Sequence, residues 1–210
     1  MITPLLPYTG PIIKTPPAIE PVNVADFRMR LRLDDTTQDA MLLAFLLAAR
    51  IAVESATRRT LITTEYQMFY EQFRAYWDGI DLLSYYLPFM ELRKPPIQRV
   101  ESITYVDIDG ATQTLDSSLY QVDTSYIMGR IVPASGADWP AVTVQPQCVT
   151  ITYLAGYGNT AASVPQPLVE AIYSLACDIY EHPEFNVESR LEESRAAKWL
   201  LNSYKLIGCE

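Results

Sequence analysis

The sequence predicts an α+β protein: a small helical bundle interrupted by an inserted antiparallel β-block of sandwich or barrel type. Apolar residues recur every three or four positions near both ends of the 210-residue chain, whereas the middle alternates with a period of two. Turn residues divide that middle into short segments, as in antiparallel sheets. Two helices are expected before the β-block and two after it, and neither pair alone buries its apolar faces well, so the pairs should pack together. The predicted organisation is an extended arm over residues 1–22, a helical domain over 23–60 and 163–208, and a β-domain over 61–162.

The amino-terminal arm is defined by its six prolines within the first 21 residues. Proline fixes φ and removes a hydrogen-bond donor, so this segment should be extended and not helical. It also carries apolar side chains, namely Leu5, Leu6, Tyr8, Ile12 and Ile13. Two interpretations stay open: a disordered leader, or an arm that lies on a neighbouring molecule.

The first two helices are predicted from capping residues and apolar spacing. Asn23 is a suitable cap for a short helix, and Thr36 is expected to start a second helix that runs to about Thr57. The second helix is apolar nearly all round from Met41 to Leu47, and such a helix must be covered on most sides. Core burial explains part of that apolarity, and a subunit interface could explain the rest.

The β-block is predicted from period-two alternation that begins after Leu61 and continues through Tyr70. Short runs rich in β-branched and aromatic residues follow, separated by Gly, Pro and Asp. The further strand candidates are residues 80–83, 97–107, 112–115, 120–123, 130–132 and 148–154.

One stretch within the β-block, residues 102–114, has two possible interpretations. Asp107, Asp109 and Gly110 have the spacing of a calcium loop, but Tyr105 would occupy its first ligand position and Asp116, too short for bidentate chelation, its last. The flanking residues are typical of strands, so we expect a β-hairpin whose tight turn takes its two positive-φ residues from Asp109 and Gly110.

The carboxy-terminal helices are predicted from two prolines suited to a first helical turn, Pro165 and Pro167, and from an amphipathic stretch over about Ser189 to Tyr204. The first of these two helices should end near His182-Pro183. Its apolar stripe comprises Leu168, Ile172, Leu175 and Ile179.

Composition narrows the classes of partner. The net charge of −9 disfavours a nucleic-acid-binding surface and an anionic membrane surface, both of which select for basic residues. The longest uncharged apolar run, Ala40 to Ala49, is well below the ~20 residues that a bilayer requires. No secretion signal is expected, and three widely spaced cysteines (Cys148, Cys177 and Cys209) favour a reducing compartment.

Signals for catalysis are weak, and we expect no enzyme activity, no cofactor, no metal and no catalytic residue. Residues 156–161 fit G-x-G-x-x-A, but Pro165 delays the helix that a dinucleotide would need directly after the glycines. His182 is the sole histidine and should sit at a helix end, while Cys177 should lie in the core. The three tryptophans and 14 tyrosines fit carbohydrate stacking and ordinary packing equally well.

Six segments, taken in order, resemble a known family. They are PPAIEPVNVADFRMRLRLDD, DAMLLAFLLAARIAVESATRRTLI, KPPIQRVESITYVDIDGATQTLD, YQVDTS, VTITYLAGYG and VPQPLVEAIYSLACDIYEHPE, which together span about residues 16–185. They resemble the head–tail connector (adaptor) proteins of tailed phages, in the family named after gp8 of phage phiE125 and related to gp6-like connectors. The first fifteen residues lie outside this pattern, and the last 25 match it loosely.

The resemblance implies a structural virion protein located in the neck between head and tail, after assembly in the host cytoplasm. It implies a ring, twelve-fold by expectation, beneath the portal protein, with genome DNA passing through its lumen without specific binding. Stopper or tail proteins would dock below. An acidic channel wall is compatible with this role because it repels the DNA phosphates and does not bind them. A carboxy-terminal portal anchor is expected at Trp199, Leu200, Leu201, Tyr204, Leu206 and Ile207.

Two alternatives remain open from the sequence. The protein could be a stopper or tail terminator, structural but elsewhere in the neck, or the β-domain could be an enzyme or a carbohydrate-binding module.

Overall fold

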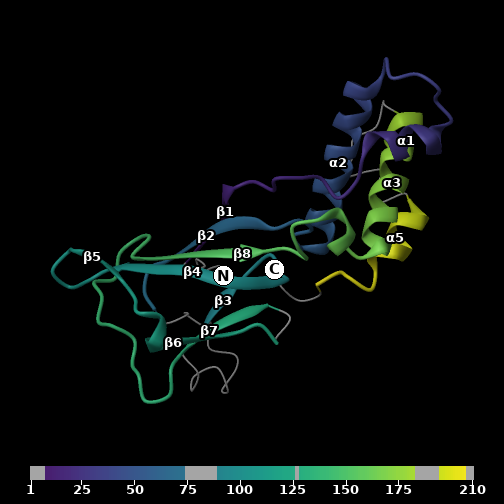
Figure 1. Ribbon diagram of the computed structural model, residues 1–210. Coiled ribbons are helices and arrows are strands. Elements are labelled where there is room, and N and C mark those ends of the chain that lie inside the picture. The colour runs from purple at the N-terminus through teal and green to yellow at the C-terminus, as the bar shows by residue number, and fades with distance from the viewer. Residues whose placement is uncertain (1–7, 74–88, 126–127, 183–193, 207–210) are drawn as a thin grey trace, which may run out of the picture. The chain divides into compact units, whose positions relative to one another are not determined.

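The computed structural model describes residues 8–73, 89–125, 128–182 and 194–206 (Figure 1). The chain divides into two compact units. The β unit comprises residues 1–16 and 63–156, and the helical unit comprises residues 17–62 and 157–210. The α+β class with helices flanking antiparallel sheets is confirmed.

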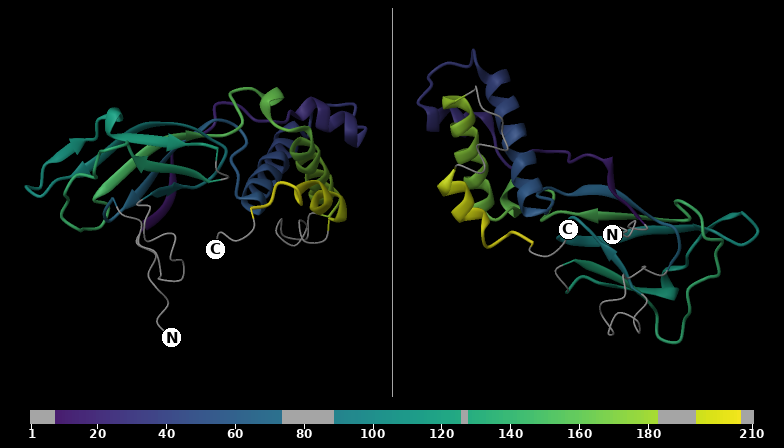
Figure 2. Two further views of the ribbon diagram at one scale, coloured as in Figure 1. Left: turned by 90° about the horizontal axis from the view of Figure 1, so that it is seen from below. Right: turned by 180° about the vertical axis from the view of Figure 1, so that it is seen from behind.

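The helical unit contains helices from both sides of the β insertion. The described elements are α1 (Val24–Leu31), α2 (Asp39–Thr57), the 3-10 turn η3 (Ala161–Ser163), α3 (Gln166–Glu181) and α5 (Arg195–Leu201). The α3 helix packs against both α2 and α5 (Figure 2). The expected pairing of amino-terminal with carboxy-terminal helices is therefore observed.

The β unit contains two antiparallel sheets. Its elements are β1 (Tyr8–Thr15), β2 (Thr64–Tyr70), β3 (Met90–Leu92), β4 (Ile97–Val106), β5 (Thr112–Thr114), the 3-10 turn η2 (Ser117–Leu119), β6 (Tyr120–Asp123), β7 (Gly129–Pro133) and β8 (Val149–Ala155). One sheet has the order β1-β2-β8-β4-β5 and the other has the order β3-β7-β6. The strand candidate at residues 80–83 lies outside the described residues.

The start of α1 follows the predicted capping, whereas the start of α2 does not. The Asn23 side chain accepts a hydrogen bond from the Asp26 amide at 2.8 Å. The α2 helix begins three residues after Thr36, at Asp39, because the Asp35 carboxylate binds the amide and hydroxyl of Thr37 and holds that segment in a turn. Asp39 pairs instead with Arg28 of α1 at 2.9 Å.

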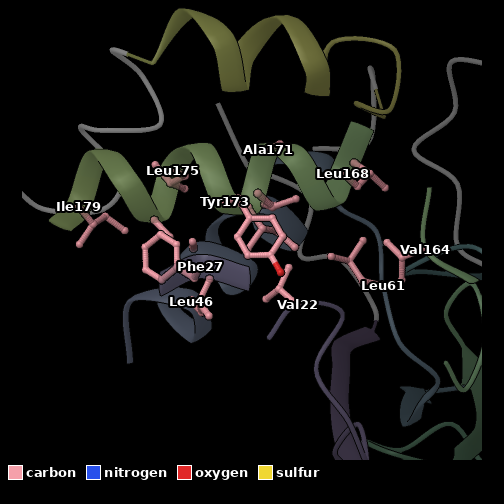
Figure 3. Close-up of a cluster of buried hydrophobic side chains, with 14 of the residues drawn as sticks. Val22, Phe27, Leu46, Leu61, Val164, Leu168, Ala171, Tyr173, Leu175 and Ile179 are labelled. Carbon is pink, nitrogen blue, oxygen red and sulfur yellow. The ribbon is translucent and has the colours of Figure 1, made fainter. Parts of the chain in front are cut away.

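The core of the helical unit is a single cluster that joins all four described helices. Figure 3 shows its members from α1, α2 and α3, such as Phe27, Leu46 and Leu175. All four residues of the predicted α3 stripe are buried in it. Phe27 of α1 is fully buried, and the hydroxyl of Tyr173 accepts a hydrogen bond from the Asn23 amide at 3.1 Å. The helices are therefore held chiefly by apolar burial across a gap of about a hundred residues in sequence.

The core of the β unit lies between the two sheets, since both contribute buried side chains to one cluster. Tyr153 of β8 is fully buried and donates its hydroxyl to the Arg93 carbonyl at 2.8 Å. At Gly129 of β7 a Cβ atom would come within 2.7 Å of the Ile97 side chain, so the close approach requires glycine. Trp139 stacks on buried Phe73, with ring centroids 5.0 Å apart. Ordinary packing therefore explains this tryptophan without carbohydrate stacking.

The predicted hairpin is confirmed, with a correction to its turn. Strand β5 pairs with β4 in the register Val106 to Thr112. Of the two turn residues only Gly110 has a positive φ, +82°, because the turn is a wider one in which the Gly110 amide donates to the Asp107 carbonyl at 3.1 Å. The Asp107 carboxylate accepts from the Ala111 amide and the Gln113 side chain, and these bonds lower its pKa.

The amino-terminal segment is extended, as its prolines predict, and residues 8–15 form an edge strand of the chain's own sheet. Strand β1 pairs antiparallel with β2, with two register irregularities. In the single chain this segment is therefore ordered against its own β2, a pairing that the sequence does not predict because it carries no signal for which strand an edge segment joins. Residues 1–7 lie outside the described part.

A pH-dependent contribution to stability is expected from Asp123 at the end of β6. Its carboxylate accepts hydrogen bonds from Ser125 and from Arg130 of β7, the latter at 2.6 Å, which lower its pKa from 3.8 to about 2. A lowered pKa gives stability that is present above the unfolded-state pKa and is lost as the pH falls through the folded-state pKa. The Asp123→Asn variant should therefore be less stable than the parent at neutral pH, and the difference should shrink between pH 4 and pH 2. Urea unfolding at several pH values measures this, and a difference independent of pH would contradict the assignment.

Candidate interaction surface

Helix α2 has two apolar faces on opposite sides. The inner face consists of Leu42, Leu46, Ala49, Val53 and Thr57, all of them buried. These positions recur every three or four residues and form one stripe along the helix. This stripe is the part of α2 that belongs to the core of the helical unit.

The outer face of α2 is a second stripe of the same length that faces away from that core. It consists of Ala40, Leu43, Ala44, Leu47, Ala48, Ile51 and Ser55, which are exposed or half-buried. Ile51 is 58% exposed and Leu43 is 42% exposed. From Ala40 to Ser55 the stripe is about 22 Å long at 1.5 Å per residue. Sequence analysis identified the excess apolarity over Met41–Leu47 but did not separate this stripe from the core stripe, because both follow the same helical spacing.

The seven positions of the outer face are uncharged, and the nearby charged residues Arg50 and Glu54 are paired. Arg50 binds Glu20 at 2.7 Å and Glu54 at 2.6 Å, and the other Glu54 oxygen accepts from the Leu61 amide at 2.9 Å. Burial raises the pKa of Glu20, although Arg50 opposes that shift. These pairs attach the segment before α1 and the segment after α2 to one edge of the helix.

The composition of the outer face suits packing against another helix. Ala40, Ala44 and Ala48 form a line of small side chains at intervals of four, beside the larger Leu43 and Ile51. Small residues permit close approach, and the larger ones provide ridges that fill grooves of a facing helix. Left in water, this stripe would be an exposed apolar patch of the kind that marks interaction sites.

Among the described residues, α2 has the length and apolar composition of a helix that could cross a membrane, and 28% of its most apolar 18-residue stretch is buried. The inner face of α2, however, is part of a protein core with α1, α3 and α5. The apolarity of α2 is therefore divided between two surfaces, one packed within the chain and the other exposed.

The six carboxy-terminal anchor candidates occupy different environments. Trp199 of α5 is 79% exposed, whereas Leu201 is fully buried in the helical core. Leu200 and Tyr204 are partly buried against that core, and Leu206 is half-buried. Ile207 lies outside the described residues. The expected helix over Ser189–Tyr204 is described only as Arg195–Leu201, capped by Ser194. Of the described candidates, Trp199 alone leaves most of its surface exposed.

A shallow groove of about 420 Å³ lies between α1, α3 and α5. Its most prominent groups are engaged with one another: Arg30 makes two 2.8 Å hydrogen bonds to Glu170 and lies 4.2 Å from the ring centroid of Tyr173. Arg30 lowers the pKa of Glu170. Cys177 is expected in the core but is only half-buried. Burial raises the pKa of its thiol. A raised thiol pKa disfavours a nucleophilic role.

The other sequence signals for chemistry have structural roles. Gly156 donates its amide to the Pro96 carbonyl at 2.8 Å, and η3 separates the glycines from α3, which begins at Gln166. A pyrophosphate would therefore meet no helix amino-terminus directly after the glycines. His182 directly follows α3, which ends at Glu181, and its amide donates to the Asp178 carbonyl. Within the described residues, no three His, Cys, Asp or Glu side chains are close enough to hold a metal ion.

The chain shares its fold with chains of gene transfer agent (GTA) particles. A chain from the neck of an empty GTA particle, with C6 symmetry, is 21% identical with a TM-score of 0.71, over 95% of this chain and 97% of that one. A chain from the neck of a native GTA particle, with C12 symmetry, is 22% identical with a TM-score of 0.66, over 95% and 97%. A chain from the virion of a native GTA particle is 22% identical with a TM-score of 0.73, over 96% and 98%.

No protein-family model matches the sequence, and no curated protein matches it. The likeness therefore defines the class at the level of fold: both units of this chain, in the same order, form the fold of chains found in the necks of GTA particles.

The two faces of α2 should respond differently to substitution in the isolated chain. Leu46→Ala on the inner face should lower the free energy of unfolding by about 2–5 kcal/mol, because it leaves a cavity in the core. Ile51→Ala on the outer face should change it by less than about 0.5 kcal/mol, because the side chain is largely in water. Denaturant unfolding of dilute protein measures both, and equal losses would contradict the assignment of an open face.

Proposed function

We propose that the protein is a structural component of the neck of a tailed phage or phage-like particle, and that it forms a ring beneath the portal as a head–tail adaptor. The observation that carries the proposal is the likeness of fold to GTA neck chains over 95% of the chain, which includes both units and their connections. The six family-like segments described above support the adaptor position in particular, and the C12 symmetry of one neck structure favours twelve copies.

The open face of α2 fits this role because a ring needs contacts between copies of one chain. With a net charge of −9, two copies of this protein carry a net electrostatic repulsion. The outer face of α2 carries no charge over seven positions, so it is a place where two acidic copies can meet at low electrostatic cost. In a closed ring each copy offers this face to one neighbour and a different surface to the other.

The other elements of the proposal follow from the same arrangement. The acidic composition suits a channel through which genome DNA passes without binding, and no catalytic step is required of the protein. Trp199 is the proposed portal anchor, since an exposed tryptophan supplies much binding energy when a partner covers it. Stopper or tail proteins would dock on the opposite end of the ring, in the virion neck, after assembly in the host cytoplasm.

The direct test is electron microscopy of the purified chain mixed with the portal protein of its own particle. A ring seated directly on the portal supports the adaptor role. A ring or plug that binds only after another neck protein has been added would instead indicate a stopper or terminator. A monomer that binds no neck component would overturn the proposal.

Ring formation should depend on the uncharged character of the α2 outer face. Ile51→Glu places a carboxylate at every copy-to-copy contact, so assembly should be lost while the isolated chain keeps its stability within about 0.5 kcal/mol. Met29→Glu is the matched control, because Met29 is a 70% exposed apolar residue on α1 of the same unit. Native mass spectrometry of both variants measures assembly, and an Ile51→Glu variant that assembles like the control would refute the role of this face.

Portal binding should depend on Trp199. Deletion of the tail from residue 197 is a poor test, because it removes Ala197 and Leu201, both fully buried. Trp199→Ala leaves the core intact and should weaken portal binding ~30-fold, about 2 kcal/mol, if this side chain is an anchor. Met29→Ala is the control, and surface plasmon resonance on immobilised portal measures the change. Equal affinities for the two variants would exclude the anchor.

A further inference from the structure

Strand β1 is weakly attached to the sheet that it completes. In the part of β1 whose side chains the structure describes, residues 10–15, no side chain is buried. Ile13 is the register partner of buried Tyr66 and so lies on the core-facing side of the sheet, yet it is 57% exposed. Ile12 pairs with Gln67 on the opposite side and is 47% exposed. An edge strand that buries so little apolar surface opens at low free-energy cost.

The attachment of β1 is mainly polar. Backbone pairing with β2 is interrupted by two register irregularities, and Pro11 has no N–H to contribute. At its end, Lys14 and Thr15 bind the Glu65 carboxylate at 3.1 Å and 2.6 Å. Each of these groups can make the same contacts with a β2 strand of its own chain or of another copy.

Strand β2, in contrast, needs a strand along this edge. Its residues alternate between buried and half-buried along its whole length, and Tyr66, Met68 and Tyr70 belong to the core. Without β1 it would present an unpaired edge beside a hydrophobic core, the arrangement most prone to unwanted strand pairing. The edge of β2 must therefore be occupied, but its contacts do not require that the occupying strand come from the same chain.

The connection after β1, residues 16–21, is held by the pair of Glu20 with Arg50 at 2.7 Å and differs from the other two connections between the units in its proline content. The connections near residues 62–63 and 156–157 are tied by hydrogen bonds, such as Tyr157 amide to Leu61 carbonyl at 2.9 Å and Gln98 side chain to Thr63 at 2.7 Å. The first connection, residues 16–21, contains three prolines and extends about 19 Å at the ~3.1 Å per residue of an extended proline-rich chain. A proline-rich segment of this kind is stiff and disfavours a sharp reversal of chain direction.

We propose that in the assembled ring β1 leaves its own sheet and pairs with β2 of the adjacent copy, so that each subunit completes the sheet of its neighbour. The partner is a second copy of this chain, because the exchanged strand makes the same register and the same Glu65 contacts as in the free chain. Exchange of an identical element adds connections between copies at little cost. A ring holds neighbouring copies at an effective concentration in the millimolar range, which favours the exchange. The inference rests on the proposed ring.

Disulfide trapping between register partners tests the exchange. Ile12→Cys and Gln67→Cys are introduced together, with Cys177 and Cys209 replaced by serine, and the oxidised protein is separated on denaturing gels without reductant. The unassembled chain should close the bond within itself and run as a monomer, which also reports that β1 and β2 are correctly folded. The ring should instead yield a ladder of covalent dimers, trimers and larger species that collapses on reduction.

The matched control is the pair Thr104→Cys and Thr114→Cys, which are register partners across the β4–β5 hairpin and are joined by a short turn. This pair should give monomers in both states. A ring that yields only monomers from the Ile12–Gln67 pair overturns the exchange and leaves the proposed function standing. The absence of any ring on the portal overturns both.

Discussion

The packing of α2 against α3 is the contact on which the rest of this structure depends. The two helices are separated in sequence by the whole β unit, and their stripes meet in one buried cluster with Phe27 and Leu201. Burial of this kind stabilises by roughly 25 cal/mol per Å² of apolar surface, and it is available only when both ends of the chain come together. The β-block is therefore an insertion between two halves of a helical unit, and its connections must leave and return close to one another. The hydrogen bond between Leu61 and Tyr157 is placed at that point.

Once the inner face of α2 is occupied by α3, the remaining apolar face of the same helix has no partner within the described residues. Leu43, Leu47 and Ile51 lie together on an uncharged stripe of the kind that marks interaction sites. In the proposed ring, a neighbouring copy would cover this surface. The electrostatics agree with this interpretation: the ionic groups of Glu20, Arg50 and Glu54 are paired at the edge of the helix and leave the stripe neutral.

The two units differ in the kind of surface that they leave exposed. The helical unit presents side chains, the outer α2 stripe and Trp199, whereas the β unit presents a strand edge covered by a lightly held β1. Side-chain surfaces provide specificity through shape and charge, and an exchanged strand provides connection through backbone hydrogen bonds.

The sequence by itself determined the order of the helices and of every described strand except β1 and β3. It also determined the α3 stripe, the Asn23 cap and the hairpin at Gly110, because each depends on neighbours within a few residues. Tertiary structure decided which apolar residues are core and which are surface. Leu201 and Trp199 look alike in an amphipathic pattern, yet one is fully buried and the other is 79% exposed, since only the position of α3 distinguishes them. The same holds for the two stripes of α2 and for the pairing of β1 with β2. Periodicity specifies that a face is apolar, whereas the partner that covers it is set by contacts distant in sequence.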